Sequence, residues 1–137
     1  MKSSSAIMLI EDDVVDVMTV QRAMRELKVP NPLRVVSNGE EALVALRDTT
    51  QSLPGLILLD LNMPRMNGIE FLSLIKQDAQ LRRLPVVVLT TSKEANDRLR
   101  SFDLGVAGYI IKPVEYDRFV EVMRAIEQYW RHSEMSP

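Results

Sequence analysis

The chain has 137 residues, no cysteine, and a net charge of −2 from 17 basic and 19 acidic side chains. This length corresponds to about one domain, which can bury a core without metal or disulfide cross-links. The lack of cysteine excludes disulfides, thiolate catalysis and cysteine-ligated zinc or iron–sulfur clusters. The sequence has no basic tract, and no apolar run reaches the ~20 residues of a membrane-spanning helix. We therefore expect a cytoplasmic protein with neither nucleic acid nor membrane among its partners.

The first predicted element is the apolar run at residues 6–10, and residues 1–5 before it are expected to be disordered. An uninterrupted apolar run of this length indicates a strand that is covered on both faces, as in a parallel sheet. After it, apolar residues recur at intervals of three and four. This spacing predicts a helix whose buried stripe is made of Val17, Val20, Met24 and Leu27.

The alternation of strand and helix continues along the chain. Further apolar runs predict strands at residues 33–36, 56–59, 86–89 and 109–111. Helical periodicity predicts helices at residues 41–47, 69–76, 94–104 and 116–130. The helix at 94–104 has Leu99 and Phe102 as its apolar residues. Five strands alternating with five helices predict a doubly wound α/β domain at residues 6–130, followed by a C-terminal tail at 131–137.

Polar residues follow four of the five predicted strands, at the point where each strand ends. In chain order they are Glu11, Asp12 and Asp13, then Asp60, then Thr90 and Thr91, then Lys112. The carboxyl ends of parallel strands meet at one edge of an open sheet, which is where ligands bind. We therefore expect carboxylates, a hydroxyl and an ammonium group to converge at that edge.

These side chains together have the chemistry of a phosphoryl-transfer site. Carboxylates held close together repel one another, and a hard divalent cation such as Mg²⁺, which prefers oxygen ligands, relieves the repulsion. Lys112 supplies a point charge and Thr90 a hydroxyl donor for phosphoryl oxygens. Asp60 can act as the nucleophile and form an acyl phosphate.

Each feature also has an ordinary structural explanation. Acidic residues before a helix commonly stabilise its N-terminus, a turn explains Asp60 with the Pro64 and Gly68 that follow, and residues 90–92 could cap the next helix. Taken alone, capping is the favoured explanation of residues 11–13 and of residues 90–92. Four strand ends that carry complementary parts of one site, in chain order, favour the site over a set of unrelated caps.

Four segments resemble the receiver domain of two-component response regulators, and the resemblance extends over residues 6–129. They are LIEDD at 9–13, LLDLNMPRMNG at 58–68, PVVVLTT at 85–91 and YIIKP at 109–113. The resemblance implies a flavodoxin-like fold with strand order 2-1-3-4-5. It also implies that a sensor histidine kinase phosphorylates Asp60 and that phosphorylation changes the protein-binding surface. Such a protein acts as an enzyme only on itself, in its own phosphorylation and dephosphorylation.

The resemblance further implies roles for single residues. The implied Mg²⁺ ligands are Glu11, Asp12, Asp60 and, through its backbone carbonyl, Asn62. The residues implied to respond to the phosphoryl group are Thr90, Lys112 and Tyr109, the last by changing rotamer. The peptide bond between Lys112 and Pro113 is often cis in this family. Asp13, an extra carboxylate, is expected to cap the first helix.

A narrower resemblance is to the phytochrome-associated response regulators. It is carried by the long loop between the second and third strands, LRRLPVVVLTTS at 81–92, KPV at 112–114 and the aromatic pair at 129–130. It implies a histidine kinase, with a bacteriophytochrome as a candidate. Seven residues follow Trp130, so we expect no output domain there. Output would be protein contact, onward phosphotransfer, or a homodimer through the C-terminal helix or the face of the fourth helix, fifth strand and fifth helix. For Trp130, helix packing is favoured over a dimer contact.

Three other functions remain open at this point. A Mg²⁺-dependent phosphohydrolase with an aspartyl nucleophile resembles this arrangement, but it usually has a second acid where this chain has Asn62. A phosphorylation-independent binding module would normally have lost one of Asp60, Thr90 and Lys112. An FMN carrier shares the flavodoxin-like fold, but no phosphate loop rich in Ser, Thr and Gly follows the first strand.

Overall fold

Residues 5–132, the part of the chain that the computed structural model describes, contain five strands and five α-helices in alternation. The strands are β1 (Ile7–Ile10), β2 (Leu33–Val36), β3 (Leu56–Leu59), β4 (Val86–Thr90) and β5 (Gly108–Ile111). The helices are α1 (Val14–Glu26), α2 (Gly39–Leu46), α3 (Gly68–Lys76), α4 (Ala95–Asp103) and α5 (Tyr116–His132), with a short 3₁₀ helix (Leu81–Arg83) before β4. Within these residues, no helix combines the length and the apolar composition that crossing a membrane requires.

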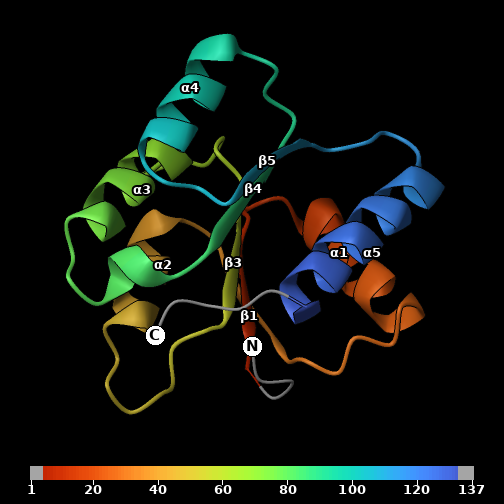
Figure 1. Cartoon of the computed structure of the whole chain (residues 1–137), viewed down its shortest axis with the longest axis horizontal. Coiled ribbons are helices and arrows are strands. Elements are labelled where there is room, and N and C mark those ends of the chain that lie inside the picture. The colour runs from red at the N-terminus through yellow and green to blue at the C-terminus, as the bar shows by residue number, and fades with distance from the viewer. Residues whose placement is uncertain (1–4, 133–137) are drawn as a thin grey trace.

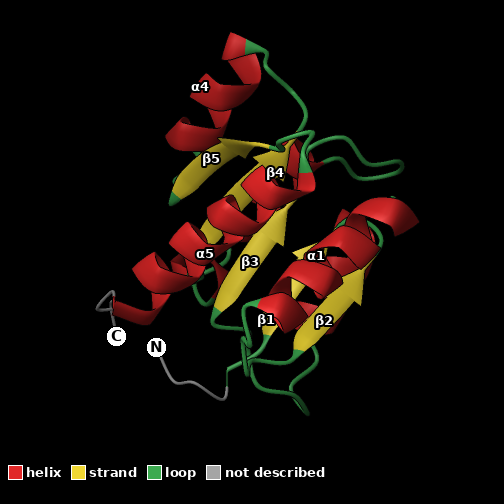
Figure 2. Ribbon diagram, turned by 90° about the vertical axis from the view of Figure 1, so that its right-hand side faces the viewer, coloured by secondary structure: helices red, strands yellow, loops and turns green. Residues whose placement is uncertain are grey.

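The strands form one parallel sheet in the order β2-β1-β3-β4-β5. Helices α1 and α5 cover one face of the sheet, while α2, α3 and α4 lie on the other side (Figures 1 and 2). The predicted fold class, strand order and single domain are confirmed. The predicted strands and helices lie within two residues of the observed bounds.

The strands are apolar without interruption because the inner strands are buried on both faces. In β1, Met8 and Ile10 belong to the core beneath α2 and α3, whereas Ile7 and Leu9 belong to the core beneath α1 and α5. The neighbouring strands β3 and β4 repeat this alternation. Their residues in the first core are Ile57, Leu59, Val86 and Val88, and those in the second are Leu56, Leu58, Val87 and Leu89.

The pairing of the strands brings their carboxyl ends to the same level. Ile10, the last residue of β1, lies opposite Val36 in β2 and Leu59 in β3. In the two strands beyond β3, Thr90 at the end of β4 lies opposite Ile111 at the end of β5. The residues that follow the strands therefore emerge along one edge, as the sequence predicts.

Polar caps begin three of the helices at this edge. Asp13 accepts hydrogen bonds from the backbone N–H groups of Val15 and Asp16, at 2.8 and 3.1 Å, so the prediction that it caps the first helix is confirmed. Asn38 caps α2 in the same way. Asn67 and Glu70 form a reciprocal capping box at the start of α3. These caps set where each helix starts, directly after the loops that carry the polar residues.

Helix α5 ends against the opposite edge of the sheet. Trp130 is 2% exposed, and its indole N–H donates to the carbonyl of Gly55, just before β3, at 3.2 Å. The side chain of Tyr129 beside it is exposed. The preference for helix packing over a dimer contact at Trp130 therefore agrees with the structure.

Two features of the structure, in α4 and before Pro113, are not predicted by the sequence. Leu99 and Phe102 are exposed, and the buried residue of α4 is Ser101, whose hydroxyl donates to the Asp97 carbonyl at 2.7 Å. The side of α4 that faces the domain thus bears a small side chain. No peptide bond in residues 5–132 is cis, so the bond between Lys112 and Pro113 is trans, unlike the family tendency.

Candidate functional site

Backbone hydrogen bonds hold the candidate residues at the edge where the strands end. Three of them, Glu11, Asp60 and Lys112, directly follow the last residue of a strand, and their amides continue the hydrogen-bonding ladder to the neighbouring strand. These bonds join Glu11 N–H to Val36 O (2.9 Å), Asp60 N–H to Ile10 O (3.1 Å) and Lys112 N–H to Thr90 O (2.8 Å). The sheet itself therefore positions two carboxylates and one ammonium group.

Three carboxylates gather at this edge. Glu11 and Asp60 are 3% and 7% exposed, Asp12 is exposed, and one oxygen of each lies within 4.8 Å of the others. An open cavity of about 680 Å³ is bordered by all three, together with Asn62 and Lys112. This donor set fits a hard divalent cation, because carboxylate and carbonyl oxygens are the ligands that Mg²⁺ prefers.

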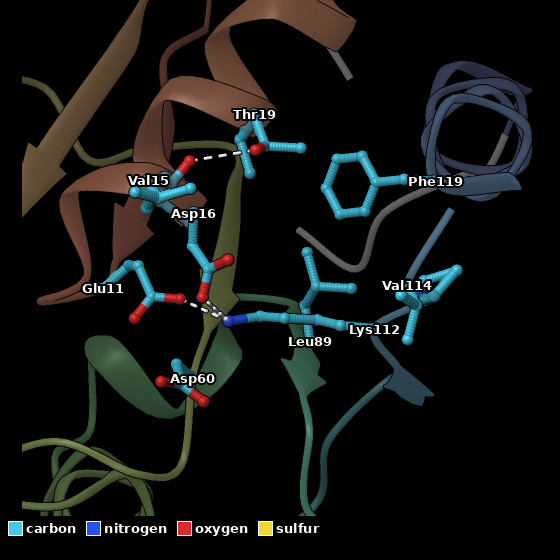
Figure 3. Close-up of a pocket in the computed structure, with 12 residues that line it drawn as sticks. Glu11, Val15, Asp16, Thr19, Asp60, Leu89, Lys112, Val114 and Phe119 are labelled. Atoms are coloured by element: carbon cyan, nitrogen blue, oxygen red, sulfur yellow. Dashed lines mark hydrogen bonds and ion pairs between the residues drawn. The ribbon is translucent and has the colours of Figure 1, made fainter. Parts of the chain in front are cut away.

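The ammonium group of Lys112 offsets part of this negative charge. It donates hydrogen bonds to the carboxylates of Glu11 and Asp16, and its distance from Asp16 Oδ2 is 2.9 Å (Figure 3). The sequence does not reveal Asp16 as part of the site, because an acid in the first turn of a helix is already explained by the helix dipole. Only the fold brings Asp16 to a lysine 96 positions later in the chain.

Glu11 and Lys112 both have shifted pKa values. Burial raises the pKa of Glu11 to about 7, since desolvation disfavours the charged carboxylate; Lys112 lowers it in part and Asp60 adds to the increase. Burial acts to lower the pKa of Lys112, but its hydrogen bonds to Glu11 and Asp16 outweigh that effect and raise it. Lys112 therefore stays charged, while Glu11 exchanges a proton near neutral pH.

Binding of a divalent cation is expected to release a proton from Glu11. Because cation and proton compete for this carboxylate, the apparent affinity should rise with pH and level off above roughly pH 8. With a pKa of about 7 for Glu11, roughly half a proton should be released at pH 7. Titration calorimetry in buffers of different ionisation enthalpy measures this number.

Two variants provide the comparison for that measurement. Glu11→Gln should release no proton, because it has no carboxyl group at this position. Asp13→Asn should behave as wild type, because Asn caps a helix as well as Asp does. A wild-type affinity that stays constant from roughly pH 6 to pH 8 would contradict the expected competition.

A second polar network, centred on Ser92, adjoins the cavity. The Ser92 N–H donates to the Thr90 hydroxyl (3.2 Å), the Tyr109 hydroxyl donates to the Ser92 carbonyl (2.9 Å), and the Ser92 hydroxyl donates to Asp97 of α4 (2.6 Å). Thr90 is fully buried, and Thr91 rather than Thr90 lines the cavity. The structure thus brings Glu11, Asp12, Asp60, Asn62 and Lys112 around one cavity, with Thr90 and Tyr109 in the adjoining network.

Gly68 allows the close approach of α3 to the backbone of the site. A Cβ atom at this position would lie 2.7 Å from Leu61 Cα and 2.8 Å from the carbonyl oxygen of Asp60. Both are backbone atoms, which cannot move aside as a side chain does. A side chain at position 68 would therefore displace the segment that presents Asp60.

Gly68→Ala is expected to destabilise the protein by about 1–3 kcal/mol, the usual cost of overpacking. This loss should exceed the gain of up to ~1 kcal/mol from the better helix propensity of alanine. Gly39→Ala is a matched control at the start of α2, where the new methyl would meet the movable side chain of Met66. Urea unfolding measures both changes, and equal stability of the two variants would contradict the backbone clash.

Comparisons with known proteins agree with this geometry. The profile of one family, described as the response regulator receiver domain, matches residues 7–124. The chain is 37% identical to the probable methanogenesis regulatory protein FilR2 of Methanothrix harundinacea, over 96% of this chain and 86% of the relative. It is 35% identical to the response regulator Rcp1 of a Synechocystis strain, over 90% of this chain and 87% of Rcp1.

Solved structures show the same similarity. The phosphorylated cyanobacterial phytochrome response regulator RcpA matches with a TM-score of 0.91 at 37% identity, over 98% of this chain and 99% of RcpA. The Mn²⁺-bound form of Rcp1 matches with a TM-score of 0.87 at 34% identity, over 97% of this chain and 99% of that structure.

Proposed function

The chain belongs to the response regulator receiver domain family, and on that basis we propose that it is a phosphorylation switch that accepts a phosphoryl group on Asp60 from a sensor histidine kinase. The observation that carries this proposal is the position of Asp60. Its carboxylate borders an open cavity together with two other acids and the Lys112 ammonium group. The structure of the similar RcpA in a phosphorylated form supports phosphorylation as the function of this chain.

The proposed reaction is a direct transfer between two side chains. A carboxylate oxygen of Asp60 attacks the phosphorus of a phosphohistidine on the kinase, the P–N bond breaks, and the imidazole takes up a proton. The product is an acyl phosphate on Asp60. Transfer of this kind depends mainly on positioning and on neutralising charge. In this chain the sheet positions Asp60, and Lys112 supplies a positive charge inside the same cavity.

The acidic residues would hold the divalent cation that this chemistry needs. Glu11, Asp12, Asp60 and the backbone carbonyl of Asn62 are the proposed ligands, and Mg²⁺ is the proposed ion. The Mn²⁺-bound form of the similar Rcp1 supports a divalent cation here. When bound, the ion supplies positive charge that offsets the charge of the phosphoryl oxygens.

The network around Ser92 is the proposed link between Asp60 and the protein surface. A phosphoryl group on Asp60 would attract the Thr90 hydroxyl, which now accepts from the Ser92 N–H. Movement of residues 90–92 would disturb the hydrogen bonds of Ser92 with Tyr109 and with Asp97 of α4. A nearly complete shift between two states needs ~5 kcal/mol of differential stabilisation, which charge-assisted hydrogen bonds to the phosphoryl group would supply.

The surface that would respond is formed by α4, β5 and α5. Its exposed apolar side chains are Leu99, Phe102, Ile111 and Tyr129. We propose that this surface binds a downstream protein or a second copy of the chain. A cytoplasmic location and a bacteriophytochrome as the kinase complete the proposal, and the phytochrome-associated relatives support the kinase assignment.

Incubation with acetyl phosphate and MgCl₂, followed by intact-mass measurement, tests this function. We expect the protein to gain one phosphoryl group with MgCl₂ and none with EDTA. Hydroxylamine should remove the group, because it cleaves acyl phosphates and leaves phosphate esters intact. No adduct, or one that resists hydroxylamine, would exclude Asp60 phosphorylation.

A further inference from the structure

The ammonium group of Lys112 is hydrogen-bonded to two carboxylates. It donates to Glu11 and, at 2.9 Å, to Asp16 Oδ2. An ammonium group has three N–H donors, so these bonds occupy two of them. We propose that Asp16 is a positioning residue that holds Lys112 toward α1 and competes with the phosphoryl group on Asp60 for its ammonium group. This inference rests on the proposed phosphorylation of Asp60.

The position of Asp16 is fixed by the start of α1. Its backbone N–H donates to the capping carboxylate of Asp13 at 3.1 Å, so the first turn of α1 is anchored where the Asp16 side chain leaves it. Asp16 and Lys112 also form an ion pair, in which their side chains are 39% and 10% exposed. The contact therefore joins a half-exposed carboxylate on α1 to a nearly buried cation that follows β5.

Asp16 differs from Glu11, the other partner of Lys112. The cluster whose oxygens lie within 4.8 Å of one another consists of Glu11, Asp12 and Asp60, and does not include Asp16. A cation bound by that cluster would compete with Lys112 for the Glu11 carboxylate. Asp16 would then remain as the acidic partner of Lys112 while the phosphoryl group is on Asp60.

The direction of the Asp16 contact indicates competition. Figure 3 shows Asp16 reaching Lys112 Nζ from the α1 side, while Asp60 lies on another side of the same nitrogen. The N–H that bonds to Asp16 is therefore occupied by a residue of α1 and not by Asp60. The attraction between Asp16 and the ammonium group therefore opposes movement of Lys112 toward a phosphoryl group on Asp60.

A simpler role for Asp16 is to stabilise the first turn of α1 through the helix dipole. That role would affect the stability of the protein and leave the affinity for a phosphoryl group unchanged. Competition for Lys112 makes the opposite prediction. Without the Asp16 carboxylate, the affinity for a phosphoryl group should rise by about two- to fivefold, which is the effect expected from the loss of a partly exposed ion pair.

Beryllofluoride, which mimics a phosphoryl group on a carboxylate, measures this effect as an equilibrium. The full chain is titrated with it in MgCl₂, and binding is followed by the backbone amide NMR signals of Thr91 and Ser92. Asp16→Asn removes the charge and keeps the size. Asp16→Glu keeps a carboxylate at this position, and Asp13→Asn removes one negative charge from the N-cap of the same helix without removing the contact of Asp16 to Lys112.

We expect Asp16→Asn to bind beryllofluoride about two- to fivefold more tightly than wild type. Asp16→Glu and Asp13→Asn should stay close to wild type, and thermal unfolding shows whether each variant is folded. An affinity of Asp16→Asn that equals wild type or Asp13→Asn, or that is weaker than wild type, would overturn the role of Asp16 alone. No binding by wild type would overturn the proposed function and this inference with it.

Discussion

Asp60→Asn is expected to abolish the phosphoryl adduct completely and to leave the fold intact. The asparagine side chain has the same size and shape as aspartate, but its amide is not a nucleophile toward phosphorus. Asp60 is 7% exposed and belongs to an acidic cluster, so replacing it with a neutral residue removes a charge that repels Glu11 and Asp12. Without divalent cation, the variant should therefore unfold at the same temperature as wild type or at a higher one.

Intact-mass measurement after treatment with acetyl phosphate, together with thermal unfolding in EDTA, checks both parts of this prediction. Asp13→Asn is the matched control, because it makes the same change in a carboxylate that caps α1. The control should gain one phosphoryl group. An adduct that persists in Asp60→Asn would place the phosphoryl group on another residue.

Lys112→Met is expected to lower the free energy of unfolding by about 3 kcal/mol at pH 8 in EDTA. Removing one partner of a buried ion pair leaves the other charge without compensation, which typically costs 3–5 kcal/mol. Here the uncompensated group is Glu11, which is 3% exposed. The loss should be smaller at pH 6, because the pKa of Glu11 is already about 7 and its protonated form carries no charge.

Urea unfolding followed by circular dichroism, at both pH values, measures this effect. Lys93→Met, at an exposed lysine, should change stability by less than ~0.5 kcal/mol. Added MgCl₂ should recover more stability in Lys112→Met than in wild type, because the acidic cluster has then lost its internal cation. An equal loss at pH 6 and pH 8 would show that the uncompensated charge of Glu11 is not the cause.

The sequence predicts Asp60 and Lys112 as members of one site because both residues directly follow a strand. Once a run of apolar residues is recognised as a buried parallel strand, the residue that follows it must emerge at the carboxyl edge of the sheet. The capping role of Asp13 also follows from local sequence, because a cap depends on the next three residues. Such features do not require knowledge of how distant segments meet.

Other features depend on how distant segments of the chain pack against one another, and the sequence does not show this packing directly. Thr90 and Thr91 are adjacent, yet Thr90 is buried and Thr91 lines the cavity, because the packing at the end of β4 covers the first side chain and leaves the second at the surface. The exposure of Leu99 and Phe102 has a similar origin. Helical spacing shows which residues share a face of α4, but the packing of the domain decides which face is covered.

Because of the contact between Trp130 and Gly55, tryptophan fluorescence reports whether α5 is packed on the sheet. Trp130 is the single tryptophan of the sequence, and it is 2% exposed against the residue that precedes β3. Asp60 follows the other end of this four-residue strand, ~13 Å away along it. The fluorescence of Trp130 should therefore shift to longer wavelength when α5 separates from the sheet. It should stay constant when a reaction at Asp60 leaves α5 in place.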